Sequence, residues 1–202
     1  MPNTNYFRFA VANRRLIAFG FLAAFSSSFG QTYFIGIFGP GIQTEFGLSH
    51  TTWGTIYLMG TLASAALLTF SGKMIDHHSL IRYTFGVCGL LMLACGFTYF
   101  VEGFVTLVVA IFLLRHAGQG LMSHIAITTM ARYFHAGRGR AIAIATLGYS
   151  TGEALLPFLA VIAIAFFGWR WTYSGVALLM VAMLTPVLLG LLKGVGNPGH
   201  GD

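Results

Sequence analysis

Long apolar runs constrain this sequence more than any other feature. An α-helix of about 20 residues crosses a hydrocarbon core of about 30 Å, since each residue adds about 1.5 Å. Runs of that length follow one another along the chain, with short polar connections between them. We therefore expect six membrane-spanning helices, at residues 16–38, 51–71, 82–101, 104–131, 140–167 and 171–192.

The composition agrees with a membrane protein and excludes an ordinary soluble domain. Only 8% of the residues are charged, whereas about a quarter of an average soluble domain is charged. The apolar runs are continuous, unlike the short alternating segments of a transmembrane β-barrel. The predicted fold class is therefore an all-α polytopic membrane protein, and the lipid bilayer is its first partner.

The domain organisation is simple. One transmembrane domain is expected at residues 16–192. It follows an N-terminal segment, 1–15, and precedes a polar glycine-rich segment, 193–202, which is either a tail or the start of a longer loop. The first apolar run is longer than the core of a signal peptide, so we interpret it as a span.

The distribution of lysine and arginine predicts the orientation. If the N-terminus is cytoplasmic, that side collects nine basic residues: Arg8, Arg14, Arg15, Lys73, Arg82, Arg132, Arg138, Arg140 and Lys193. The opposite side holds only Arg170. Cytoplasmic loops carry such an excess. We therefore expect a bacterial inner (plasma) membrane protein with both termini in the cytoplasm.

Motifs for other functions are missing from the sequence. There is no Walker motif, dinucleotide fingerprint or HExxH motif. Cys88 and Cys95 lie on one face of an apolar helix and are interpreted as small packing residues. We expect no cofactor, no metal, no nucleic-acid partner and no enzymatic activity.

Two charges lie deep inside apolar runs and mark the candidate site. A charge at the centre of a bilayer costs about 2.5 to 3.5 kcal/mol on insertion scales, so such residues usually face a protein interior and have a function. These two residues are Arg115 and Glu153.

Arg115 is predicted to share a polar ridge with two neighbours. On a regular helix Gln119 falls at about 40° from Arg115 and Ser123 at about 80°. A guanidinium presents a planar donor fork that matches a carboxylate, so the ridge suits an anionic substrate. The alternative is a structural role, in which Arg115 pairs with Glu153 and holds helices together.

Glu153 is the candidate for proton coupling. A low-dielectric environment favours its neutral form and a nearby arginine favours its charged form, so a site between the two could exchange a proton. The alternatives are a permanent pair with Arg115 or a protonated acid packed between helices. Gly148, Gly152 and Pro157 on the same run are interpreted as packing and hinge residues.

The first and fourth spans are the most polar of their respective triplets. Gln31 and Tyr33 in the first span are further candidates to bind a ligand. Two three-helix units of opposite orientation are a common plan among transporters, with the substrate between them. We expect that arrangement here.

Several motifs resemble those of the major facilitator superfamily. The segment from Gly72 through Asp76 to Arg82 is similar to the family's loop between spans 2 and 3, although Ser79 and His77 replace a glycine and an arginine. Further resemblances lie at RHAGQG (115–120), ARYFHAGRGRAIAIA (131–145), GYSTGEALLP (148–157) and FGWRWTY (167–173). The stretch at 36–53 is most similar to monocarboxylate and oxalate/formate-type porters.

The resemblance implies a transport function and a second set of six spans. Members have twelve spans and work by alternating access, whereas this sequence has six. A second six-helix half would come from the same chain beyond residue 202, from a second copy or from a separate subunit. Asp76 would latch the cytoplasmic side by pairing with an arginine or a helix N-terminus, partly from the other half, and Gly72 and Arg82 are candidates for the same gate. The alternative is that Asp76 is a solvated loop acid.

The expected function is secondary active transport of a small organic anion such as a monocarboxylate, with symport of a proton as a further feature. The alternative is a non-transporting accessory or assembly subunit of a membrane complex.

Overall fold

A computed structural model describes residues 6–195, and these residues form helices and short connections without a strand. The α-helices are α1 (Tyr6–Ala12), α2 (Arg14–Ser27), α3 (Thr32–Phe46), α4 (His50–Ser71), α5 (Leu80–Phe97), α6 (Phe104–Leu114), α7 (Ser123–Tyr133), α8 (Arg138–Leu179) and α9 (Thr185–Leu192). Three 3₁₀ segments are η1 (Ser28–Gly30), η2 (Gly72–Asp76) and η3 (Thr98–Phe100), and two π-helical segments are η4 (Arg115–Met122) and η5 (Met180–Leu184).

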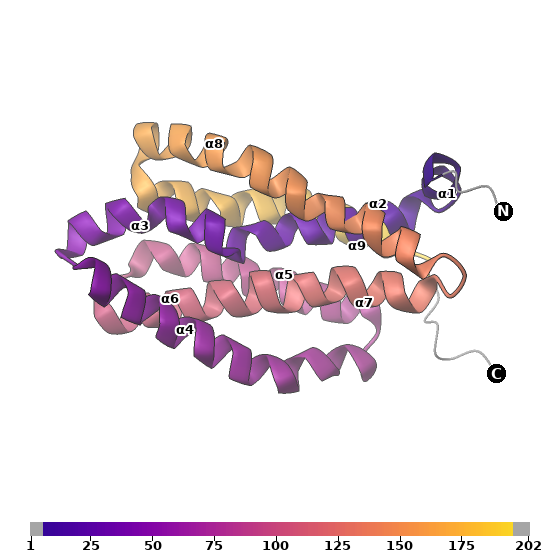
Figure 1. The fold of residues 1–202 in the computed structure, drawn as a ribbon, viewed down its shortest axis with the longest axis horizontal. Coiled ribbons are helices and arrows are strands. Elements are labelled where there is room, and N and C mark those ends of the chain that lie inside the picture. Colours follow the sequence, from indigo (N-terminus) through magenta and orange to yellow (C-terminus); the bar gives the residue numbers. More distant parts are fainter. Residues whose placement is uncertain (1–5, 196–202) are drawn as a thin grey trace.

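Five helical stretches among the described residues are long and apolar enough to cross a membrane: Arg14–Phe46, His50–Asp76, Leu80–Phe100, Phe104–Tyr133 and Arg138–Leu192. The last one turns back on itself at Gly168, where φ is 72° and ψ is 166°. Figure 1 shows this turn, from which the later part of α8 runs back towards α9. The fifth stretch therefore holds both the fifth and the sixth of the spans expected from the sequence.

The first span is longer than predicted and is interrupted. We expected residues 16–38, but the helical stretch continues to Phe46. Pro40 lies inside α3 without ending it, and the helix ends where Gly47 adopts a left-handed conformation with φ of 59°. Glycine accepts this conformation readily, and it is the common way to end a helix.

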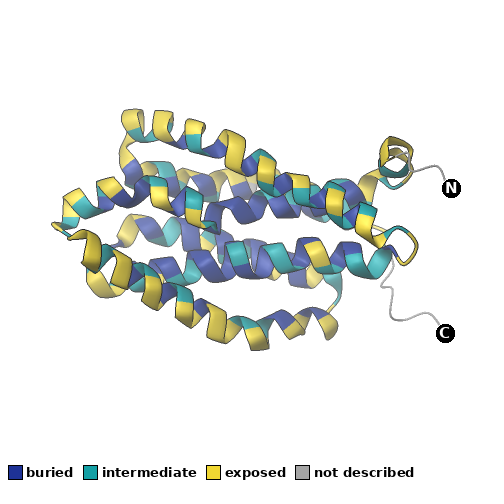
Figure 2. Cartoon of the chain, in the orientation of Figure 1, coloured by how far each residue is buried: buried dark blue, intermediate teal, exposed yellow. Residues whose placement is uncertain are grey.

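The helices form two layers in Figure 1. The first half of α8, then α2 with α3, then α6 with α7, and then α4 lie side by side towards the viewer, while α5 and α9 lie behind them. The first and fourth stretches form the centre, each with 56% of its apolar window buried, whereas the second has only 17% buried. Figure 2 shows the same gradient, with exposed residues along α4 and α8.

The described ends of the first and last spans lie at the same end of the bundle (Figure 1). An Nη2 atom of Arg15 donates hydrogen bonds to the carbonyl oxygens of Gly190, at 3.3 Å, and Lys193, at 2.7 Å. A chain that crosses the membrane an even number of times must have its first and last spans end on the same side. Most of the glycine-rich segment after Lys193 lies outside the described residues.

The opposite end is held by a cluster around Glu45, which the sequence did not predict. The Glu45 carboxylate accepts hydrogen bonds from Trp169 Nε1 at 2.6 Å and from Arg170 Nε and Nη2 at 2.9 and 2.7 Å. Arg170 Nη1 also donates to the Tyr99 carbonyl at 2.6 Å. This Glu45 cluster joins the first, third and sixth spans.

The turn at Gly168 gives a direct test of the sixth pass. We expect Gly168→Ala to destabilise the protein by about 1–3 kcal/mol, because its φ and ψ belong to a region that only glycine occupies without strain. Thermal unfolding in detergent measures the effect. Gly175→Ala is the matched control: an added Cβ there also meets open space, but its backbone is helical, so it should be neutral or slightly stabilising. Equal effects of the two changes would contradict the strained turn.

Candidate functional site

The first span is broken near the middle of its length. Helix α2 passes into the 3₁₀ turn η1, and Gln31 is extended, with ψ of 153°, before α3 begins. A broken helix leaves backbone carbonyls without their usual donors, and in hydrocarbon such groups must find partners within the protein. The carbonyl oxygens of Phe29 and Gly30 are the two that matter here.

Two side chains from distant spans bond these carbonyls. The Tyr173 hydroxyl, from the sixth span, donates to the Phe29 oxygen at 2.6 Å. Arg115 Nη1, from the fourth span, lies 3.5 Å from the Gly30 oxygen and donates to Thr32 Oγ1 at 3.0 Å. The break is therefore bonded from both sides of the bundle.

Arg115 lies in a compact group of side chains, which we call the Arg115 cluster: Arg115, Gly30, Thr32 and Tyr57. The arginine is buried, with 8% of its surface exposed. Its guanidinium carbon lies 5.5 Å from the centroid of the Tyr57 ring, and the Tyr57 hydroxyl donates to Thr32 Oγ1 at 3.0 Å. The guanidinium is thus held by uncharged groups, through hydrogen bonds and a cation–π contact.

A glycine-to-glycine contact brings the first and fourth spans close enough for these bonds. A Cβ added at Gly118 would lie 2.6 Å from the Gly30 Cα, and one added at Gly30 would overlap the Leu114 carbonyl oxygen. Neither position therefore accepts a side chain without separating the two spans. Small residues permit this kind of backbone approach between membrane helices.

The fourth span is irregular at the same place. Residues 115–122 form the π-helical segment η4, so the regular wheel expected from the sequence is wrong over this stretch. π-helical turns are rare and frequently mark functional sites. Arg115 bonds to the first span, Ser123 lies beside Tyr149 of the fifth span, and Gln119 Oε1 has no hydrogen-bond partner among the described residues.

Other buried polar atoms near this break also lack partners within the described residues. They are Ser26 Oγ, Ser28 Oγ, Tyr33 Oη, Arg115 Nε and Tyr149 Oη. Two of them lie close enough to a neighbouring hydroxyl to interact with it, Tyr33 with Ser28 and Tyr149 with Ser123. Gln31 is an exception, since its Nε2 lies 3.5 Å from Ser27 Oγ in the preceding turn. Most buried polar groups in proteins are hydrogen-bonded. The first, fourth and fifth spans therefore place a group of polar side chains beside the break, several of them without a full set of hydrogen bonds.

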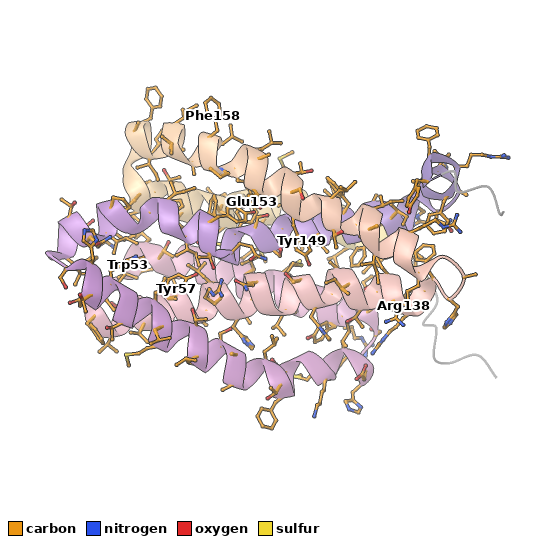
Figure 3. The ribbon with its side chains drawn as sticks, viewed as in Figure 1. Trp53, Tyr57, Arg138, Tyr149, Glu153 and Phe158 are labelled. Carbon is orange, nitrogen blue, oxygen red and sulfur yellow. The ribbon has the colours of Figure 1, made fainter. Side chains whose placement is uncertain are left out.

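Glu153 lies on the outside of the six-helix unit. Its side chain is exposed, and Figure 3 shows it with Tyr149 near the middle of α8. It lies close enough to Tyr33 to act on it electrostatically. The described ion pairs join Asp76 to Arg132 and Glu45 to Arg170, so they give no support to a structural Arg115–Glu153 pair.

The small residues beside Glu153 pack against the first span, as expected. A Cβ at Gly148 would overlap the Phe21 carbonyl oxygen, and one at Gly152 would overlap Ser28 Oγ. Pro157 lies inside α8, one turn beyond Glu153. The two glycines let the backbones of the fifth and first spans approach each other closely.

At the end that holds Arg15 and Gly190, Asp76 pairs with an arginine. The partner is Arg132 at the end of α7, which also lies 3.4 Å from the Ile75 carbonyl oxygen. Gly72, Asp76 and Arg132 line a surface cleft of about 260 Å³. Arg82 is exposed and takes no part in this pair.

Sequence reasoning missed several residues of the site. Thr32, Tyr57 and Tyr173 hold the broken span, and Gly30 and Gly118 make the close contact. Gly118 lies inside the RHAGQG motif, and Gly30 lies within the polar stretch SSSFGQTY (26–33) of the first span, so the sequence around both glycines already indicated a site. Among the described residues, no group of three histidine, cysteine, aspartate or glutamate side chains could hold a metal ion.

The glycine contact can be tested by enlargement. We expect Gly118→Ala to destabilise the protein by about 1–3 kcal/mol, because the added methyl group forces the first and fourth spans apart. Thermal unfolding in detergent measures this loss. Gly86→Ala on α5 is the matched control, since an added Cβ there meets open space. Unchanged stability in Gly118→Ala would contradict the contact.

Comparison with known proteins agrees with the helical plan. The sequence matches the family described as Major Facilitator Superfamily over residues 20–200. A search of curated protein sequences gives no match. The matched region includes all six passes, the broken first span and the Arg115 cluster. The chain therefore belongs to the Major Facilitator Superfamily and is a multi-pass membrane transporter protein.

Proposed function

We propose that this chain is one six-helix half of a secondary active transporter for a small organic anion, such as a monocarboxylate. One observation carries the proposal: a buried guanidinium without a described carboxylate partner, beside a broken helix and a group of polar side chains. Family membership supports transport in general. The positive charge of Arg115 supports the proposal that the substrate is an anion.

The chemistry of the Arg115 cluster favours a carboxylate. Arg115 Nη1 donates to Thr32, the Tyr57 ring lies against the guanidinium, and Arg115 Nε has no described partner. An arginine in this state retains its charge and can donate to an anion. Gln119, Ser123, Gln31 and Tyr33 would then supply neutral hydrogen bonds, because their polar groups lie on the same two spans.

The exposed position of Glu153 supports a second six-helix half. A carboxylate facing lipid would carry a large energetic cost, and acids in membrane spans almost always face protein or water. The exposed flanks of α4 and α8 offer a surface for such a half (Figure 2). The second half would come from the same chain beyond residue 202, a second copy or another subunit.

Alternating access would use features in corresponding places of two inverted three-helix repeats. The first and fourth spans, which open the two triplets, are both irregular, at Gln31 and at residues 115–122. Interrupted helices in corresponding positions are a pointer to a transporter's binding site. The cytoplasmic gate would combine Gly72, Asp76 and Arg82, with Arg132 as the partner of Asp76. Rocking would bend the fifth span near Gly148, Gly152 and Pro157.

Substitution of Arg115 tests the substrate class. We expect Arg115→Lys to lower uptake of small carboxylates by about 10- to 100-fold, because an ammonium loses charge-assisted hydrogen bonds worth about 1.5–3 kcal/mol. Uptake of radiolabelled formate, oxalate and lactate into proteoliposomes holding the complete transporter measures this. The control is Arg138→Lys, an exposed residue that begins α8 at the end of the bundle (Figure 3). Uptake equal to wild type in a folded Arg115→Lys protein would remove the guanidinium from the mechanism.

Substitution of Glu153 tests proton coupling. We expect Glu153→Gln to abolish accumulation driven by a pH gradient while exchange of labelled for unlabelled substrate continues, because an amide cannot release a proton. Both modes are measured in the same proteoliposomes. Glu102→Gln, an exposed acid between the third and fourth spans, is the control and should retain both modes. Accumulation at the wild-type level in Glu153→Gln would exclude Glu153 as the coupling residue.

A further inference from the structure

A second surface cleft lies far from the Arg115 cluster, at the end of the bundle where Arg15 contacts the end of the last span. Its volume is about 400 Å³, and it lies between the start of α5 and the end of α9. Its lining consists of residues 79–81, Tyr133 and residues 192–195. Neither the proposed transport site nor the Asp76–Arg132 pair uses these residues.

The start of α5 leaves polar groups available to this cleft. Ser79 occupies the N-cap position, but its side chain makes no capping bond, and no acid lies in the first turn. The Ser79 hydroxyl oxygen is buried and has no hydrogen-bond partner among the described residues. The first N–H groups of a helix and its dipole favour an anion at that position.

Among the described residues, the charged side chains that line this cleft or lie in the first turn of α5 are basic. Lys193 lines it, Arg82 lies in the first turn of α5, and Arg15 reaches the Lys193 carbonyl oxygen at 2.7 Å. Within the described chain, the nearest acid in sequence is Asp76, which is paired with Arg132. Arg82 at a helix start is unfavourable by itself because it faces the positive end of the dipole. An anion in the cleft would interact favourably with Arg82 and with the positive end of the α5 dipole.

The cleft also has apolar walls. Leu80, Ile81, Leu192 and Val195 contribute them, and 38% of the Ile81 surface is exposed. The cleft lies at the ends of the third and sixth spans, where a membrane protein meets the lipid headgroups. A ligand that matches both properties has an anionic phosphate and an apolar tail.

We propose that this cleft binds the phosphate group of an anionic membrane lipid. The phosphate oxygens accept hydrogen bonds from the first-turn N–H groups of α5 and from the Ser79 hydroxyl. Lys193 and Arg82 neutralise the charge, and the start of an acyl chain lies against Ile81 and Leu192. Basic pockets between membrane helices bind acidic headgroups in this way. The proposal does not depend on the transported substrate.

Native mass spectrometry of the full chain in detergent tests the site, with phosphatidylglycerol and phosphatidylcholine as probes. We expect preferential retention of phosphatidylglycerol, and a loss of about fivefold in Lys193→Gln, since one basic residue near a membrane surface contributes about 1 kcal/mol. Ser79→Asp should lower retention at least tenfold, because its carboxylate occupies the same helix start. The same change should leave thermal stability equal or higher, since aspartate is a good N-cap residue.

A control variant and a competition with inorganic phosphate show whether the binding is specific to the cleft and to a lipid. Arg138→Gln removes an exposed cation at the same end of the bundle but outside the cleft, so it should leave lipid retention unchanged (Figure 3). An excess of inorganic phosphate should not displace the lipid. Equal retention of both lipids, an equal loss in Arg138→Gln, or displacement by inorganic phosphate would each overturn the proposal.

Discussion

The structure depends on how backbone carbonyls are satisfied where the first span breaks. Inside a bilayer no water is present to bond a carbonyl that has lost its helical donor. Arg115 and Tyr173 supply donors to Gly30 and Phe29 from the fourth and sixth spans. These contacts require the glycine crossing at Gly118, and the π-helical segment lies at the same level. The break, the crossing and the buried arginine therefore form one arrangement.

This arrangement explains how a charge is tolerated at the centre of the bundle. An arginine at mid-membrane costs about 2.5–3.5 kcal/mol on insertion scales, and a hydrogen bond to a charged group returns about 1.5–3 kcal/mol. The bond to Thr32 and the weaker contact with Gly30 offset a large part of that cost without neutralising the charge. The Tyr57 ring adds a further favourable contact. Arg115 thus remains an electrostatic attraction for an anion.

The sequence predicted the spans well and the site only in part. Apolar run length located the passes, because it depends on bilayer thickness alone. The even number of predicted spans also predicted that the two described ends lie at the same end of the bundle. Asp76 pairs with an arginine of the same unit, Arg132. The break at Gln31 and the π-helical turn were not predictable, because hydrophobic periodicity reports the apolar face of a helix and not its backbone bonds.

Contacts between distant residues were also beyond the sequence. Arg170 was expected on the side opposite the termini, and Glu45 lies between the first two predicted spans on that same side, but no pattern in the sequence joined the two residues. Tyr57 was overlooked because one aromatic residue in an apolar run resembles any lipid-facing or core residue. The roles of Gln119, Ser123, Gln31, Tyr33 and Glu153 stay predictions, as does the second six-helix half.

The Glu45 cluster and the Asp76–Arg132 pair have a mechanical consequence when they are compared. Both lie at the surface, where an ion pair is worth about 0–1 kcal/mol. The first is a carboxylate with three donor atoms, tied through Arg170 to a third span, whereas the second joins two spans. Fewer side-chain contacts therefore have to break for the helices to separate at the Asp76–Arg132 pair than at the Glu45 cluster. Arg170 is central to this difference, because among the described residues it alone connects the Glu45 carboxylate to the Tyr99 carbonyl oxygen.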